Sequence, residues 1–177
     1  MLPRCVLLDR DGVINEDADM GILDVAAWRP LPGSVGAIAR LTAAGIPVAV
    51  CTNQSAIARG YLSEATLHRI HARMAAVIES AGGRLEAVRY CPHGPDDGCR
   101  CRKPAPGLIE QALARLDCRP TDAVMIGDSR RDLEAAARAG VAAWLVRTGN
   151  GRATASEVDP AVPIHDDLAA AVEVLLQ

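Results

Sequence analysis

The chain of 177 residues contains no phenylalanine, and its aromatic side chains are two tryptophans and two tyrosines. Proteins that bind single-stranded nucleic acid without sequence preference stack bases on aromatic side chains, so this composition disfavours such a platform. The formal net charge of −3 also lacks the basic excess that is typical of nucleic-acid-binding proteins. We therefore expect no nucleic-acid partner.

Long apolar runs are missing as well. No stretch approaches the roughly 20 apolar residues that span a bilayer, and residues 1–8 lead straight into Asp9 without the pattern of a signal peptide. Six cysteines in a chain of this length do not indicate a secreted disulfide scaffold. We expect a monomer of the cytoplasm with no membrane partner.

Half of the residues are nevertheless apolar, mostly small aliphatics, which suits helices packed on a parallel sheet. Apolar runs that indicate buried strands alternate with helical patterns. We expect strands at 5–8, 46–51, 85–90, 123–126 and 142–146, and helices at 34–43, 64–81, 106–116, 131–139 and 166–176. The pattern predicts an α/β fold of three layers, Rossmann-like, with a parallel central sheet. We find no linker or internal repeat and expect a single domain over residues 1–177.

Polar residues directly follow three of the expected strands, namely Asp9 and Asp11, Thr52 and Asn53, and Gly127 and Asp128. In an open parallel sheet the ligand crevice lies at the carboxyl ends of the strands. These residues are therefore expected to converge, and Lys103 at the foot of the next helix can join them. No insertion after Asp11 or before Lys103 is long enough for a large cap domain.

The chemistry of phosphate-ester hydrolysis asks for this set of side chains. Asp9 and Asp128 can supply the carboxylate oxygens that Mg²⁺ prefers. Asp9 can attack phosphorus to give a covalent intermediate, and Asp11 can act as general acid and then as general base. Thr52 and Lys103 can hold the non-bridging oxygens. Each piece alone is typical of a turn or a helix cap, and it is their order after three apolar strands that favours catalysis.

The motifs resemble those of the haloacid dehalogenase-like phosphatase superfamily over essentially the whole chain. They are Asp9-Arg10-Asp11-Gly12-Val13, Thr52-Asn53, Lys103, and Gly127-Asp128 with Asp132 behind. The resemblance implies an aspartyl-phosphate on Asp9, acid–base catalysis by Asp11, and phosphate stabilisation by Thr52 and Lys103. It also implies Mg²⁺ held by Asp9, Asp128 and the backbone carbonyl of Asp11.

The segment from about 91 to 103 is rich in cysteine, proline and glycine and has few large apolar groups. Its candidate metal ligands are Cys91, His93, Cys99 and Cys101. Three sulfurs and one imidazole match a closed, structural Cys₃His zinc site. A disulfide and four unconnected residues are the alternatives, of which the disulfide is disfavoured in the cytoplasm. Zinc in this loop would fix Arg102 and Lys103, which follow the last ligand.

The zinc loop resembles two branches of the superfamily, the D-glycero-D-manno-heptose 1,7-bisphosphate 7-phosphatases and the histidinol-phosphate phosphatases. The stretches at 52–60 and 146–149 look like the heptose branch. That resemblance implies removal of the 7-phosphate from a small sugar bisphosphate. It implies a substrate pocket lined by Asp17, Ala18, Asp19, Met20, Thr52, Asn53, Gln54, Ser55, Arg102 and Lys103. Arg102 fits a second anionic group, because a guanidinium grips phosphate through two donors.

Departures from the heptose branch and other functions keep alternatives open. Ala56 stands where that branch commonly has glycine, and Met20-Gly21-Ile22 replaces a segment that contains an aromatic residue in that branch. The alternatives are a histidinol-phosphate phosphatase, a nucleic-acid 3′-phosphatase, and a zinc-stabilised binding protein that has lost catalysis. His68 and His71 share one helix without a third metal ligand, so we expect both at the surface.

Overall fold

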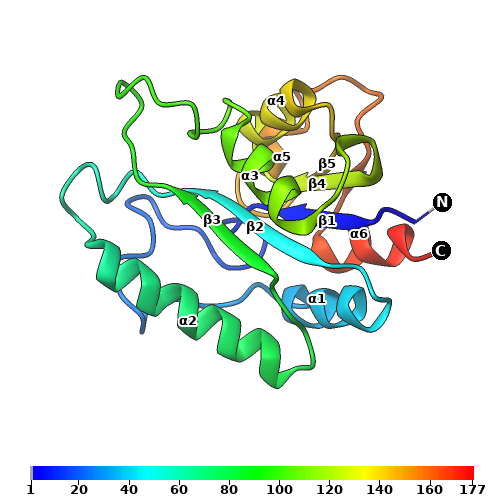
Figure 1. Ribbon diagram of the computed structural model, residues 1–177, viewed down its shortest axis with the longest axis horizontal. Coiled ribbons are helices and arrows are strands. Elements are labelled where there is room, and N and C mark those ends of the chain that lie inside the picture. Colours follow the sequence, from blue (N-terminus) through cyan, green and yellow to red (C-terminus); the bar gives the residue numbers. More distant parts are fainter. Residues whose placement is uncertain (1) are drawn as a thin grey trace.

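The computed structural model describes residues 2–177 and contains one six-stranded parallel sheet with the order β3-β2-β1-β4-β5-β6 (Figure 1). The strands are β1 (Cys5–Leu8), β2 (Val48–Asn53), β3 (Ala87–Cys91), β4 (Ala123–Gly127), β5 (Ala142–Val146) and β6 (Ile164–His165). The chain moves outward in one direction from β1 to β3 and then in the other from β4 to β6. The change of direction lies between β1 and β4, where open α/β sheets bind ligands.

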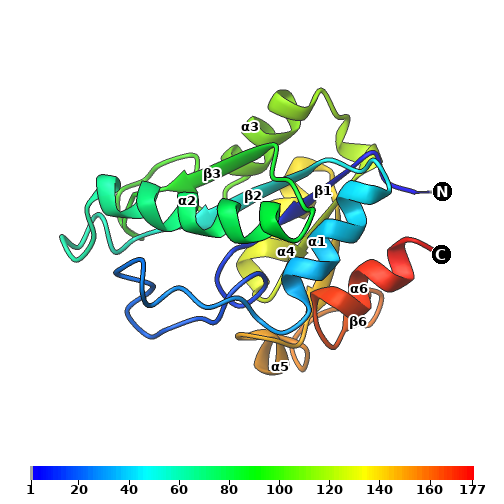
Figure 2. The ribbon, with the colours of Figure 1, turned by 90° about the horizontal axis from the view of Figure 1, so that it is seen from below.

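Helices cover both faces of this sheet, which confirms the predicted α/β architecture (Figures 1 and 2). One face carries α1 (Ser34–Ala43), α2 (Glu64–Ser80) and α6 (Leu168–Leu175), and the other carries α3 (Gly107–Leu116) and α4 (Arg130–Ala139). The remaining helical turns are the 3₁₀ segment Pro120–Asp122, before β4, and the short α5 (Gly151–Thr154), after β5.

The two hydrophobic cores follow from the period of two along each strand, because successive side chains point to opposite faces. In β1, Val6 and Leu8 pack toward α1 and α2, whereas Cys5 and Leu7 pack toward α3 and α4. All four side chains are fully buried. A strand covered on both faces has no solvated positions, which is why β1 reads as an uninterrupted apolar run.

Helix α2 is the longest helix and begins where the sequence predicts. The side chain of Ser63 accepts a hydrogen bond from the backbone N–H of Thr66 at 3.1 Å, as an N-cap does. Buried residues recur along one stripe of the helix, namely Leu67, Ile70, His71, Met74 and Ile78. His71 is only 8% exposed, so the expectation that it lies at the surface is wrong.

The element boundaries differ from the prediction mainly around β2. The strand begins at Val48 rather than at Ile46 and continues through Thr52 and Asn53, which were expected in the following loop. Thr52 and Asn53 belong to the strand because they pair with Tyr90 and Cys91 of β3. The first candidate zinc ligand, Cys91, is accordingly the last residue of a strand. The two-residue β6 was not predicted, since so short a strand leaves no pattern.

The two ends of the described chain lie on the same side of the molecule (Figure 1). Leu2 and Gln177 line one apolar groove together with Trp144. The loops that follow β2 and β3 project from the opposite end of the sheet (Figure 1). Within residues 2–177, no helix is both long and apolar enough to cross a membrane.

Candidate active site

The carboxyl ends of β1, β2 and β4 surround one polar cavity of about 220 Å³. Every residue predicted for the catalytic, magnesium and substrate sites lines it, namely Asp9, Asp11, Asp17, Ala18, Asp19, Met20, Thr52, Asn53, Gln54, Ser55, Arg102, Lys103 and Asp128. The structure therefore brings together residues that are more than 100 positions apart in sequence.

Lys103 lies at the centre of the site and is only 2% exposed. Its Nζ donates to the backbone carbonyl of Cys51 at 2.7 Å and pairs with Asp132 at 2.5 Å and with Asp9 at 2.9 Å. Burial alone would lower the pKa of Lys103, but the two carboxylates outweigh it and raise that pKa. The ammonium group is therefore permanently charged and fixed in direction by three acceptors.

Asp9 follows the last residue of β1 and presents one free oxygen to the cavity. Its Oδ1 accepts from the backbone N–H of Arg10 at 2.7 Å and from Lys103 at 2.9 Å. Within residues 2–177, Oδ2 receives no hydrogen bond. Burial, followed by repulsion from Asp132, raises the pKa of Asp9 to about 8, although Lys103 opposes the shift. Lys103 alone does not offset the burial and the negative charge around this carboxylate, and a bound cation would supply further positive charge.

Asp128, which directly follows β4, is held by Asn150, a residue of the loop after β5 that was not predicted for the site. The backbone N–H and the side-chain amide of Asn150 donate to its Oδ2 at 2.8 and 3.2 Å. A side chain at Gly12 or at Gly149 would put its Cβ 2.2 Å from that same oxygen. Both glycines also have a positive φ, of 81° and 55°. Only glycine lets the two loops close around this carboxylate.

The third acid, Asp132, has both oxygens occupied. Oδ1 accepts from Lys103, and Oδ2 accepts from the backbone N–H of Ser129 at 3.0 Å and from its hydroxyl at 2.6 Å. The hydroxyl of Ser129 is thus committed to the capping box of α4. Of the three acids whose oxygens lie within 4.8 Å of one another, Asp9 and Asp128 keep an oxygen for a metal. These donors fit Mg²⁺, which takes one or two carboxylates and keeps several waters.

Asp11 accepts hydrogen bonds from three neighbouring side chains. The guanidinium of Arg10 donates to both of its oxygens, with Nε and Nη2 each at 3.0 Å. Asn15 donates to Oδ1 at 2.8 Å, and Gln54 donates to Oδ2 at 2.9 Å. Charge-assisted bonds of this kind are the stronger ones and fix the plane of the carboxylate.

One hydroxyl and two amides at and just after the end of β2 line the cavity. Thr52 Oγ1 accepts from Gln54 at 2.9 Å, so the hydroxyl proton of Thr52 is directed elsewhere. The amide of Asn53 bonds the backbone N–H and carbonyl of Lys103, both at 3.0 Å. The side chains of Gln54 and Asn53 therefore position Asp11 and Lys103, a role that their place in the motif did not indicate.

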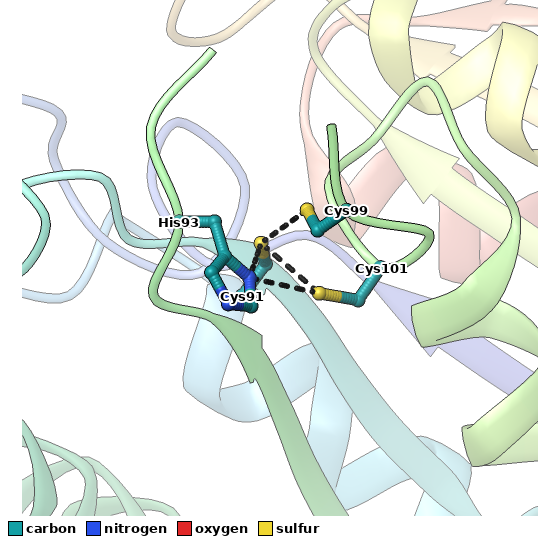
Figure 3. Close-up of side chains that lie close together, drawn as sticks. All are labelled: Cys91, His93, Cys99 and Cys101. Carbon is teal, nitrogen blue, oxygen red and sulfur yellow. Dashed lines mark hydrogen bonds between the residues drawn. The ribbon is translucent and has the colours of Figure 1, made fainter. Parts of the chain in front are cut away.

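The four candidate zinc ligands form a second cluster beside this cavity, and their side chains point toward one another (Figure 3). The Sγ of Cys91 lies 3.7 Å from that of Cys99 and 3.3 Å from that of Cys101. The Nδ1 of His93 lies 3.5 Å from Cys91 and 3.3 Å from Cys101. Bonds of about 2.3 Å at tetrahedral angles would place zinc-bound sulfurs about 3.8 Å apart. The cluster is slightly tighter than that and fits one tetrahedral ion.

The distances between these sulfur atoms also argue against a disulfide bond within the cluster. A disulfide needs an S–S length of about 2.05 Å, and all six cysteines have free thiols. The cluster is connected to the cavity through Arg102, whose backbone N–H lies 3.4 Å from Cys99 Sγ and whose Nη1 donates to the carbonyl of His93 at 3.2 Å. A metal ion or any other contact that orders this loop would therefore also fix the position of Arg102 at the mouth of the cavity.

Comparisons with known proteins agree with this geometry. The model of the HAD-hydrolase-like family matches residues 100–171. The D-glycero-β-D-manno-heptose-1,7-bisphosphate 7-phosphatase of Bordetella bronchiseptica is 48% identical over 176 residues, which cover 98% of each chain. The protein of the same name from Pseudomonas putida is 47% identical over 174 residues, or 98% of this chain and 99% of the relative. The chain belongs to the heptose-bisphosphate phosphatase family of haloacid dehalogenase-like hydrolases.

Solved structures of this family have the same fold. The crystal structure of D,D-heptose 1,7-bisphosphate phosphatase from B. bronchiseptica, complexed with magnesium and phosphate, superposes with a TM-score of 0.95 at 48% identity and covers 98% of both chains. The enzyme from Burkholderia thailandensis gives 0.77 at 36% identity over 98% of this chain and 99% of its own. The predicted superfamily and branch are confirmed.

The cavity of this family member is also lined by residues that were not predicted for the substrate pocket, among them Arg131, Asn150, and Arg59 from the stretch that resembles the heptose branch. Burial, followed by the charge of Arg131, lowers the pKa of Arg102, and Arg59 adds to this effect. The positive charges of Arg59 and Arg131 therefore act on Arg102, and all three guanidinium groups line the cavity. An arginine outside a motif looks the same in sequence whether it is solvated or binds an anion, so only the fold could reveal them.

Proposed function

We propose that the chain is a magnesium-dependent phosphatase that removes the 7-phosphate of D-glycero-β-D-manno-heptose 1,7-bisphosphate. The observation that carries the proposal is the single cavity in which Asp9, Asp11, Lys103 and Asp128 meet, in a chain 48% identical to a phosphatase of that name. We assign the whole reaction to one catalytic domain spanning residues 1–177.

In the first half-reaction, Asp9 acts as the nucleophile. Its unpaired Oδ2 forms a bond to phosphorus while the bond between phosphorus and the C7 oxygen breaks. The electron pair of that bond passes to the sugar oxygen, which takes a proton from Asp11 and leaves as an alcohol. Lys103 and the hydroxyl of Thr52 stabilise the charge on the non-bridging oxygens.

In the second half-reaction, Asp11 removes a proton from a water molecule whose oxygen attacks the aspartyl-phosphate. The bond between Asp9 and phosphorus breaks, the Asp9 carboxylate is restored, and inorganic phosphate leaves. The net reaction consumes one water. Mg²⁺, when held by Asp9, Asp128 and the carbonyl of Asp11, supplies the positive charge that lets an anionic nucleophile approach a phosphate dianion.

The arginines at the cavity mouth account for the preference for a bisphosphate. Arg59, Arg102 and Arg131 carry three positive charges that the reacting phosphate, already paired with Lys103, does not need. A second phosphate on the same sugar offers oxygens to their planar donors. Asp17 and Asp19, on the facing loop, are suited to accept hydrogen bonds from sugar hydroxyls.

We further propose that zinc occupies the Cys₃His cluster as a structural ion. Four protein ligands leave no open position for substrate. Six unpaired cysteines suit a reducing compartment, so the site of action we propose is the cytoplasm. We propose that the protein acts as a monomer, since one chain supplies all the catalytic and magnesium-binding side chains that the proposed reaction uses.

The experiment that tests the proposal is phosphate release with Mg²⁺ from the β and α anomers of the heptose 1,7-bisphosphate, with histidinol phosphate as comparator. We expect the highest kcat/KM for the β anomer, and phosphorus NMR should show the sugar 1-phosphate and inorganic phosphate as the two products. A higher kcat/KM for histidinol phosphate would overturn the substrate assignment. Loss of the 1-phosphate would overturn the proposed orientation of the sugar.

A further inference from the structure

His71 lies behind the catalytic site, buried among residues that do not touch the cavity. Its Nε2 is 3.1 Å from Nη1 of Arg10, and the two side chains are 8% and 0% exposed. Neither residue lines the cavity. His71 belongs to α2, while Arg10 belongs to the loop after β1, so this contact ties a helix on one face of the sheet to the catalytic loop.

The chemistry of arginine decides which atom donates in this contact. A guanidinium has only donors, so Nε2 of His71 is the acceptor and the ring proton is on Nδ1. Burial, followed by the charge of Arg10, lowers the pKa of His71 to about 3, which agrees with a neutral ring. His71 therefore acts as a fixed neutral acceptor inside the protein.

The other donors of Arg10 face Asp11. Nε and Nη2 each lie 3.0 Å from an oxygen of that carboxylate. A planar guanidinium that binds a carboxylate through two donors fixes the plane of both groups. With Nη1 bound to His71, the guanidinium is anchored on both sides, and Asp11 is anchored through it.

We propose that His71 is a positioning residue for acid–base catalysis. By accepting from Nη1 it fixes the orientation of Arg10, and Arg10 fixes the plane of the Asp11 carboxylate at the edge of the cavity. The inference rests on the proposed function, because it requires Asp11 to protonate the leaving alcohol.

The test uses two substrates that differ in their need for a proton. The sugar oxygen of heptose 1,7-bisphosphate must be protonated as it leaves, whereas p-nitrophenolate leaves p-nitrophenyl phosphate as a stable anion. The value of kcat/KM reports the steps up to the first irreversible one, which is phosphoryl transfer to Asp9. Misplacing the acid should therefore lower kcat/KM for the sugar much more than for the aryl ester.

A matched pair of variants separates the hydrogen bond from general polarity. The Oε1 of glutamine in H71Q occupies the place of Nε2 and can still accept from Arg10, whereas the shorter side chain of H71N does not reach it. We expect H71N to lower kcat/KM for the heptose bisphosphate about tenfold, as loss of a supporting partner commonly does, and H71Q to restore most of it. KM should stay unchanged, because His71 does not line the cavity.

The control is the neighbouring histidine on the same helix. His68 Nε2 lies 3.0 Å from the hydroxyl of Tyr90 and has no contact with Arg10. H68N should leave both substrates unaffected, and thermal unfolding should be measured for all variants. Equal loss of kcat/KM on both substrates in H71N, or no recovery in H71Q, would overturn the positioning role.

The variant D11N distinguishes this inference from the proposed function on which it rests. If D11N lowers kcat/KM more for the sugar than for the aryl ester while H71N does not, only the role of His71 fails. If D11N lowers both equally, Asp11 is not the general acid and the proposed proton transfer fails with it.

Discussion

The carboxylate cluster and the Cys₃His cluster both gather metal-binding side chains, but the chain supports them differently. Asp9 and Asp128 directly follow adjacent buried strands. Lys103 contacts Asp9, and Asn150 donates a hydrogen bond to Asp128. Of the sulfur cluster, only Cys91 belongs to a strand, and the other members lie in a loop without helix or strand.

The difference lies in what neutralises each cluster without a metal. Lys103 places a positive charge among the carboxylates, so the sheet and one buried lysine can maintain that geometry. The polar contacts of the sulfurs are mainly with one another and with His93 (Figure 3). We infer that the fold itself holds the carboxylates in place, whereas the loop of the Cys₃His cluster is ordered by the metal ion that the cluster would bind.

The largest effect on turnover is expected at the carboxylate cluster. D9N replaces the nucleophile with a neutral amide of the same shape, so turnover should fall about 10⁴-fold or more. The melting temperature should not fall, because the charge that is removed is repelled by Asp132 and Asp128. Phosphate release and thermal unfolding check this. A large decrease in melting temperature would mean that the ion pair between Lys103 and Asp9 stabilises the fold, contrary to this expectation.

A smaller effect, on both stability and activity, is expected at the Cys₃His cluster. C99S should lower bound zinc, measured by elemental analysis, and should lower both melting temperature and kcat/KM, the latter about 10- to 100-fold. Activity falls because the backbone N–H of Arg102 is bonded to Cys99 and Lys103 comes next in the chain. The control is C118S, since Cys118 lies outside the cluster. Full activity in zinc-free C99S would show that the loop orders itself.

The smallest effect is expected at Arg102, which connects the two clusters. R102M removes one of the three charges proposed to bind the second phosphate, so KM for the bisphosphate should rise about tenfold with kcat little changed. R130M is the matched control, because Arg130 pairs with Glu134 on the surface and does not line the cavity. An equal rise in KM for a monophosphate substrate would show that Arg102 binds the reacting phosphate instead.

The sequence was sufficient to predict those functional residues that directly follow a buried strand. Asp9 and Asp128 follow apolar runs that are buried on both faces, and the parallel sheet brings their ends together. The cysteine spacing likewise identified the second cluster, because three cysteines and one histidine within residues 91–101 have few other reasons to lie together.

The support of these residues could not be predicted in the same way. Whether His71 is buried depends on which face of α2 packs inward, and the partner that makes burial possible lies 61 residues away. Asn150 belongs to a loop with no periodic pattern, and its contact with Asp128 depends on two glycines that allow close approach. Hydrogen bonds between distant loops exist only in the folded chain.

The neighbouring ends of the chain have a consequence for engineering. Leu2 and Gln177 line the same groove, and the described chain ends lie at the opposite end of the sheet from the loops that follow β2 and β3 (Figure 1). A short linker could join them, and the chain could be reopened at an exposed loop without changing the strand order. Opening it near Asp96, inside the sulfur-bearing loop, would leave Cys91 and Cys101 on opposite halves of the permuted chain, so that metal binding would become the staple between its two new ends.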